Sequence, residues 1–176
     1  MQTEASSPKK DRQTVTPEGH SVEEPIAGVI IRPTRLIEDD RGDLCEMFNP
    51  AWGISTPLVY AVQVTIRPKK VKGWAVHRKQ DDRYFISYGV FRIALYDDRA
   101  DSPTHKRLMV FTISDRNRAL IVIPHGVYHA IQNLGEIDAM FIDMPTELYN
   151  YGDPDKYRLP LKNDLIPYAF EDTPGW

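Results

Sequence analysis

Short runs of β-branched and aromatic residues follow one another from Ile26 onward, and each run ends at a cluster of Gly, Pro, Asp or Asn. No stretch sustains the 3.6-residue apolar period of an amphipathic helix. Short strands separated by turns at fairly regular spacing are typical of an all-β sandwich or barrel. The 14 prolines among 176 residues exceed the usual share of about 5% and disfavour long helices. We therefore expect a single all-β domain over residues 26–176, with strands near 28–32, 43–48, 58–66, 73–77, 83–88, 90–96, 108–113, 119–123, 128–133 and 139–144.

Residues 1–25 differ from the rest of the chain in composition. They contain no aromatic residue and few apolar ones, too few to offset the entropy lost on ordering, so we expect a disordered tail. The tail lacks the apolar stretch of a signal peptide and carries Glu4, Asp11 and Glu18, which targeting peptides avoid. The single cysteine, Cys45, cannot form an internal disulfide. These features predict a cytoplasmic protein.

Charge and hydropathy exclude two classes of partner. The net charge of −3 and the pI near 5.9 give no basic field for a phosphate backbone, so we expect no nucleic-acid partner. The longest apolar runs fall far short of the roughly 18 residues that a membrane-spanning helix needs. We expect no membrane partner either.

Residues 124–133, PHGVYHAIQN, match the pattern P-x-G-x-x-H-x-x-x-N at every fixed position. This is the second sequence motif of the cupin proteins. Pro and Gly suit a tight turn between two strands, and His129 then lies between Val127 and Ile131 on the face that alternation directs inward. The motif predicts that His129 projects into the bowl of a barrel.

The first cupin motif is only partly present. It normally supplies two histidines and a glutamate, whereas this chain keeps His77 and has Lys79 where the second histidine would stand. A mononuclear metal centre normally takes three or more protein ligands. His77, His129 and perhaps Asp82 would form a marginal set, so we expect no metal and no cofactor.

A wider set of residues identifies a family resemblance. It comprises, in chain order, Asp40-Arg41-Gly42, Glu46, Gln63, His77, Asp98-Arg99, Ser102-Pro103-Thr104, the 124–129 turn, Tyr149 and Asp153-Pro154. In this order, and over roughly residues 28–160, the chain resembles the dTDP-4-dehydrorhamnose 3,5-epimerase family of cupin-fold nucleotide-sugar enzymes. The resemblance implies a jelly-roll barrel, a metal-independent homodimer, and epimerisation of carbons beside the 4-keto group of a dTDP-6-deoxyhexose.

The resemblance also implies roles for individual residues. His77 falls on the family's general base, which removes a proton from the carbon next to the ketone, and His129 falls on a second pocket histidine. Arg41 and Gln63 match residues that bind the nucleotide diphosphate, and Tyr149 matches a pocket tyrosine. An imidazole suits proton abstraction because it titrates near neutrality.

The acid position departs from the family pattern. Where the family has the tyrosine that reprotonates the opposite face of the sugar, this chain has Asp143. We expect Asp143, or alternatively Tyr149, to act as the acid.

Three further positions depart from the pattern. The arginine that precedes the base by three residues is Trp74, and the expected lysine falls near residues 81–82, with Arg83 close by as a substrate-binding candidate. The aspartate that orients the base has only Glu171 or Asp172 at a comparable distance. These losses at catalytic positions imply rearranged contacts to the phosphates and the enolate oxygen.

Three functions remain open from the sequence. The leading one is a nucleotide-sugar epimerase or isomerase, the second a non-catalytic cupin that binds a nucleotide sugar, and the third a metal-dependent cupin. For single residues the alternative is a structural role. His77 and His129 would then be buried barrel histidines, and Arg41 a turn residue neutralised by its acidic neighbours.

Overall fold

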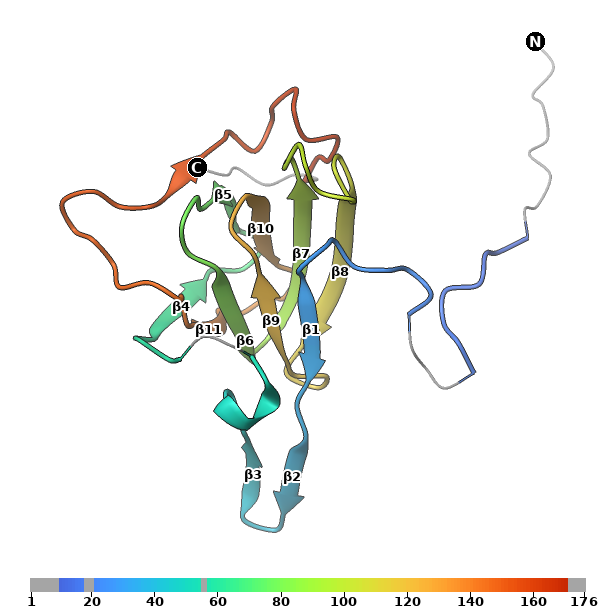
Figure 1. Ribbon diagram of the computed structural model, residues 1–176. Helices are drawn as coiled ribbons and strands as arrows, with labels where there is room; N and C mark the ends of the chain where they lie inside the picture. The colour runs from blue at the N-terminus through green and yellow to red at the C-terminus, as the bar shows by residue number, and fades with distance from the viewer. Residues whose placement is uncertain (1–9, 18–20, 55–56, 171–176) are drawn as a thin grey trace.

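The computed structural model describes residues 10–17, 21–54 and 57–170. Two five-stranded antiparallel sheets face each other and form the barrel (Figure 1). The first sheet has the order β1 (Ile30–Pro33), β9 (Ala119–Ile123), β6 (Asp82–Tyr88), β11 (Ala139–Asp143) and β4 (Val62–Ile66). The second has the order β12 (Tyr157–Arg158), β5 (Val71–Val76), β10 (Val127–Asn133), β7 (Val90–Asp97) and β8 (Leu108–Ser114). The all-β, cupin-like fold expected from the sequence is confirmed.

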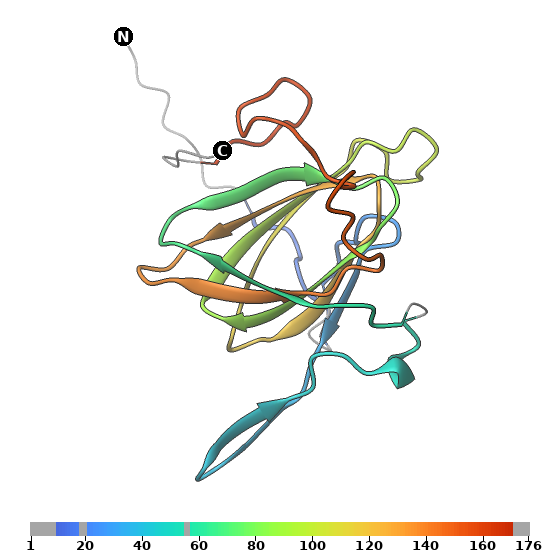
Figure 2. The same cartoon turned by 90° about the vertical axis from the view of Figure 1, so that its left-hand side faces the viewer.

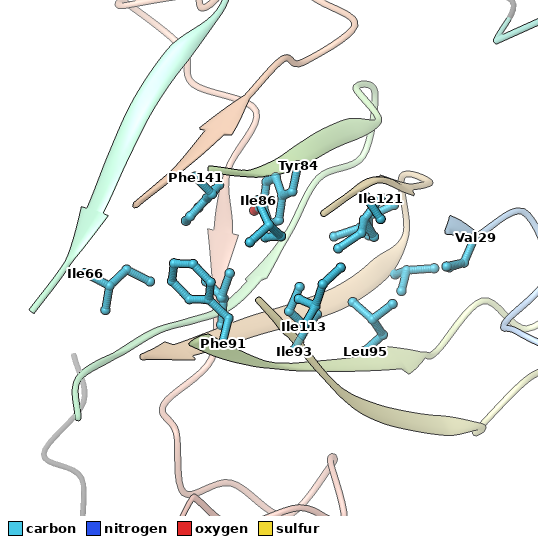
Figure 3. Close-up of a cluster of buried hydrophobic side chains, with 14 of the residues drawn as sticks. Val29, Ile66, Tyr84, Ile86, Phe91, Ile93, Leu95, Ile113, Ile121 and Phe141 are labelled. Carbon is cyan, nitrogen blue, oxygen red and sulfur yellow. The ribbon is translucent and has the colours of Figure 1, made fainter. Parts of the chain in front are cut away.

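The core lies between the two sheets. Phe91, Ile93 and Leu95 alternate along β7 and are fully buried, and they meet the inward residues Ile121 and Ile123 of β9 (Figure 3). Burying each of these side chains contributes about 1.5–3 kcal/mol relative to exposing it. The alternation therefore fixes the register, because a slip by one residue would turn the apolar set outward.

A two-stranded hairpin projects away from the barrel (Figure 2). It consists of β2 (Leu36–Asp39) and β3 (Gly42–Cys45), joined by a turn at Asp40 and Arg41. Ile37 and Leu44 are paired across the hairpin and are 52% and 59% exposed. The hairpin thus carries apolar side chains that the chain itself does not cover.

All ten predicted strands overlap an observed one, but two boundaries differ by three or more residues and two observed strands were not predicted. The expected strand 58–66 begins only at Val62, and the expected strand 43–48 ends at Cys45. Between them the chain leaves the sheet through the short 3-10 helix η1 (Pro50–Trp52), which the Asn49 side chain caps. Strands β2 and β12 were not predicted, because both are short and largely exposed.

The described part of residues 1–25 lies on the outside. Apart from the half-buried Thr16, residues 10–17 and 21–25 are exposed, with an isolated bridge between Val15 and Ser21. Burial begins at Ile26, which is fully buried. Disorder of the tail stays a prediction. In the described ranges no helix is long and apolar enough to cross a membrane.

Candidate active site

A cavity of about 520 Å³ opens where the barrel meets the segment that follows β11. Side chains from both sheets reach it, because β4 and β11 belong to the first sheet and His77 follows β5 of the second. The lining includes three residues expected at the site, His77, Asp143 and Tyr149. It also includes Tyr60, Lys79 and Gln80, and Tyr151, Asp155 and Lys156 from the 145–156 segment. The cavity therefore brings His77, Asp143 and Tyr149 together.

His77 is held in place by the 153–156 segment. Its Nδ1 faces the backbone carbonyl oxygen of Asp155, which can only accept a hydrogen bond, so Nδ1 carries the hydrogen. The Asp155 carboxylate accepts from the backbone N–H groups of Arg78, Lys79 and Gln80 at 3.0, 2.7 and 3.1 Å. The contact at Nδ1 orients the ring and leaves Nε2 as the reactive nitrogen, and the three N–H contacts hold Asp155 in place.

Asp82 lies at the centre of a buried polar cluster. Its Oδ2 is 3.2 Å from Nε2 of His77 and 3.4 Å from Nε2 of His129. The hydroxyl of Tyr84 donates to the same oxygen at 3.1 Å, and the Gln80 amide donates to Oδ1 at 2.8 Å. Asp82 and Tyr84 share the inner face of β6 because they are two residues apart.

The turn motif places His129 as expected. Gly126 has φ +79° and donates its N–H to the His77 carbonyl at 2.7 Å, which ties the 124–127 turn to the end of β5. His129 then pairs with Ala75 of β5 and is 5% exposed. The prediction that His129 points into the barrel is confirmed.

Burial and charge act in opposite directions on this cluster. Burial lowers the pKa of His77, but the hydrogen bond and charge of Asp82 outweigh it and raise the pKa above the ordinary value. Burial alone would raise the pKa of Asp82, but His77 and the other partners hold it below the usual range. For His129, burial outweighs the attraction of Asp82 and lowers the pKa to about 4. His77 is thus a stronger base than free histidine, and His129 is neutral at pH 7.

Asp143 has the opposite electrostatic character. Burial, reinforced by the negative charge of Asp82, raises its pKa well above the ordinary value. Its Oδ1 is buried and has no hydrogen-bond partner. Burial therefore favours the neutral carboxylic acid form of Asp143, which lines the cavity from the sheet opposite the one that carries β5.

Three cations lie beside Asp143. A smaller cavity of about 120 Å³ is lined by Lys72, Lys156 and Arg158, and it shares Asp143 and Lys156 with the larger one. Burial and the charges of Lys156 and Arg158 lower the pKa of Lys72. This concentration of positive charge suits an anionic group bound next to the carboxylic acid.

Arg41 and Gln63 lie away from the cavity of their own chain. Arg41 is in the turn of the projecting hairpin, its side chain is 85% exposed, and it pairs with Asp39. Gln63 is exposed on the outer face of β4, because it alternates with the cavity residues Val62 and Val64. One chain by itself therefore does not place these two residues at the site.

Arg83 was predicted to bind substrate, but its place is in the scaffold. Between Asp82 and Tyr84 on β6, it points to the outer face and is fully buried. Its guanidinium donates to the carbonyl of Met144 at 2.7 Å and to that of Pro145 at 3.2 Å. Arg83 thus supports the cavity rim from behind and does not line the cavity.

Trp74 fills the position where the family has an arginine. It is fully buried and packs against Tyr168 and Phe170, with ring centroids 6.3 and 5.7 Å apart. The candidates Glu171 and Asp172 lie outside the described residues, and the contact to His77 that they were expected to make comes from Asp82.

Several site residues were missed from the sequence. Asp82 had been considered only as a marginal metal ligand, although its position two residues before Tyr84 on a strand signals a shared inner face. The Asp153-Pro154 motif points to the right segment, but nothing in the pattern singles out Asp155 or Lys156.

Comparison with known proteins identifies the family and the fold. A sequence model of the dTDP-4-dehydrorhamnose 3,5-epimerase family matches residues 23–159. The probable low-salt glycan biosynthesis epimerase Agl13 of Haloferax volcanii is 34% identical over 139 residues, which cover 77% of this chain and 88% of the relative. The spore coat polysaccharide biosynthesis protein SpsL of Bacillus subtilis is 32% identical over 143 residues, 81% of this chain and 95% of the relative. The crystal structure of a dTDP sugar isomerase from Desulfovibrio desulfuricans superposes with a TM-score of 0.79 at 22% identity, covering 86% of this chain and 96% of that chain.

Proposed function

The chain belongs to the dTDP-4-dehydrorhamnose 3,5-epimerase family, and from this premise we propose that it epimerises a carbon beside the 4-keto group of a dTDP-4-keto-6-deoxyhexose, with His77 as base and Asp143 as acid. One observation carries the assignment of roles. A histidine and a carboxyl group, each with a raised pKa, line one cavity from facing sheets. Epimerisation requires this pair, because a proton leaves one face of the sugar and another arrives on the opposite face.

The base step uses Nε2 of His77. The Nδ1–H group is directed at the Asp155 carbonyl, so the Nε2 electron pair takes the proton from the carbon next to the ketone. The proton then lies between Nε2 and the Asp82 carboxylate, 3.2 Å away. Asp82 stabilises the imidazolium formed in this step and acts as a positioning residue.

The acid step uses the Asp143 carboxyl group. Its protonated form, which the raised pKa favours, supplies a proton to the enolate carbon, and the resulting carboxylate lies beside the cations Lys72, Lys156 and Arg158. The same three cations can hold the substrate diphosphate. Tyr149, on the exposed rim with Tyr151, is the alternative acid.

We further propose that the protein forms a homodimer through the β2–β3 hairpin. The exposed pair Ile37 and Leu44 needs a cover, and a second copy of the chain supplies it. In this arrangement Arg41, which lies at the turn between the two strands, contacts substrate only in the partner's cavity. The unpaired Cys45 suits the reducing cytoplasm, which we propose as the location.

Sedimentation tests the dimer. We expect the wild type to have twice the 20.2 kDa monomer mass at micromolar concentration, and Leu44→Asp to be monomeric because it buries a charge in the interface. Ile137→Asp is the matched control, since Ile137 is equally exposed at 59% but lies on a turn outside the hairpin. A monomeric wild type, or a dimeric Leu44→Asp variant, would contradict the proposal.

Deuterium exchange tests the reaction. In deuterated water, the EDTA-treated protein should introduce deuterium at C3 or C5 of dTDP-4-keto-6-deoxyglucose and produce an epimer. dTDP-glucose, which has no ketone to acidify these positions, should remain unlabelled. Binding of the keto sugar without any exchange would instead establish a non-catalytic nucleotide-sugar-binding protein.

A further inference from the structure

The buried cluster of His77, Asp82 and His129 has the composition of a metal site. His77, Asp82 and His129 are at most 5% exposed, and their donor atoms lie within 4.8 Å of one another. Nε2 of each histidine is 3.2 or 3.4 Å from Oδ2 of Asp82. A tetrahedral ion with bonds of about 2.0–2.1 Å holds its ligand atoms roughly 3.4 Å apart. The distances from Oδ2 of Asp82 to the two histidine nitrogens therefore match the spacing of ligand atoms around a tetrahedral ion.

The contacts of the Nδ1 atoms of the two histidines also support a metal site. Nδ1 of His77 faces the Asp155 carbonyl, and Nδ1 of His129 faces the Val127 carbonyl at 3.2 Å. Because a carbonyl only accepts, each neutral ring carries its hydrogen on Nδ1 and keeps the Nε2 electron pair, near the Asp82 carboxylate, available to bind an ion. Metal-ligating histidines are oriented in this way, with the second ring N–H donated to a backbone carbonyl or a carboxylate.

We propose that Nε2 of His77, Oδ2 of Asp82 and Nε2 of His129 bind one divalent transition-metal ion. Two imidazoles and one carboxylate favour the Zn²⁺ and Co²⁺ class over Mg²⁺ and Ca²⁺, which prefer oxygen ligands. Three protein ligands leave a further coordination position open. His77 also lines the large cavity, so the ion is reachable from the substrate side.

The consequence for activity is inhibition, and this part rests on the proposed function. The ion occupies the Nε2 electron pair with which His77 abstracts the proton. A loaded protein therefore has no free base, although its fold and its other cavity residues are unchanged. Nε2 of His77 cannot bind zinc and abstract a proton at the same time.

Cobalt spectroscopy tests the binding site without substrate. Titrating Co²⁺ into EDTA-treated protein at neutral pH should give the visible absorption of low-coordinate Co²⁺, saturating at one ion per chain, and Zn²⁺ should displace it. His129→Gln, which keeps a polar side chain of similar size, should weaken binding by at least the roughly 10–100-fold that loss of an outer partner costs. His125→Gln is the matched control, because His125 pairs with Asp81 on the surface and is no part of the cluster. Absence of saturable binding by the wild type, or equal binding by His129→Gln, overturns the site.

Deuterium exchange with and without Zn²⁺ tests the inhibition. One equivalent of Zn²⁺ should abolish the exchange catalysed by the metal-free protein, and EDTA should restore it. Exchange that persists in the loaded protein, or that requires the metal, overturns the inhibition. If the metal-free protein shows no exchange while Co²⁺ still binds, the proposed reaction fails and the metal site stands.

Discussion

Replacing His77 with Asn should reduce deuterium exchange into the keto sugar by 10²–10⁴-fold, the contribution that a general base typically makes, while dTDP affinity should change little. The amide retains a donor for the Asp155 carbonyl and much of the ring's polar shape. It cannot accept a proton near neutral pH. Exchange is measured by mass spectrometry on EDTA-treated protein and affinity by calorimetry, so that loss of the base is separated from loss of binding.

The control for this variant is His125→Asn. His125 is exposed, lies outside the cavity lining and pairs with Asp81, so its replacement should leave exchange unchanged. A His77→Asn protein that exchanges within a factor of about three of wild type, on the scale set by a general base, would show that another group abstracts the proton.

The alternation of residues along strands explains both the successes and the errors of the sequence-based prediction. It correctly directs His129 into the barrel, because Val127 and Ile131 face the same way. The same rule directs Gln63 outward, against the role that the family resemblance implies, and the structure follows the alternation. Packing of the sheet decides where a side chain points. A residue such as Gln63, which matches the family motif but lies on the outer face, therefore does not reach the pocket of its own chain.

Arg83 illustrates a second limit. Its neighbours Asp82 and Tyr84 face inward, so alternation places Arg83 on the outer face. A buried arginine at this position is unexpected, because arginine side chains are mostly exposed in proteins. The sequence could not predict that the carbonyls of Met144 and Pro145 would accept hydrogen bonds from its guanidinium. Those contacts depend on how an irregular segment folds back over the sheet.

The remaining site residues lie in the irregular 145–156 segment and could not be predicted for the same reason. Asp155 orients His77 and the loop after β5, and Lys156 joins the two cavities. Neither residue belongs to a strand, so no period predicts its direction. The strand pattern could have placed Asp82 on the inner face, but its contact with His77 joins β6 of one sheet to the residue that follows β5 of the other. Only the three-dimensional arrangement shows that contact.

Replacing Asp143 with Asn separates the two halves of the reaction. The amide fills the same space but has no acidic proton, so formation of the epimer should fall by 10²–10⁴-fold, as expected for loss of a general acid. His77 can still remove a proton and return a deuteron to the same face. We therefore expect substrate that is labelled with deuterium but keeps its configuration, which NMR distinguishes from the epimer.

Two further variants decide whether the carboxylic acid or the rim tyrosine donates the proton. Asp143→Tyr restores a donor of the type that the family resemblance implies at this position, so it should recover part of the epimerisation lost in Asp143→Asn. Asp138→Asn, an exposed carboxylate on the turn before β11, is the matched control and should behave as wild type. If Asp143→Asn still forms epimer at the wild-type rate while Tyr149→Phe gives labelled substrate of unchanged configuration, Tyr149 is the acid. The raised pKa of Asp143 would then serve only to keep its carboxyl group neutral beside the Asp82 carboxylate, where a second negative charge would oppose formation of the enolate.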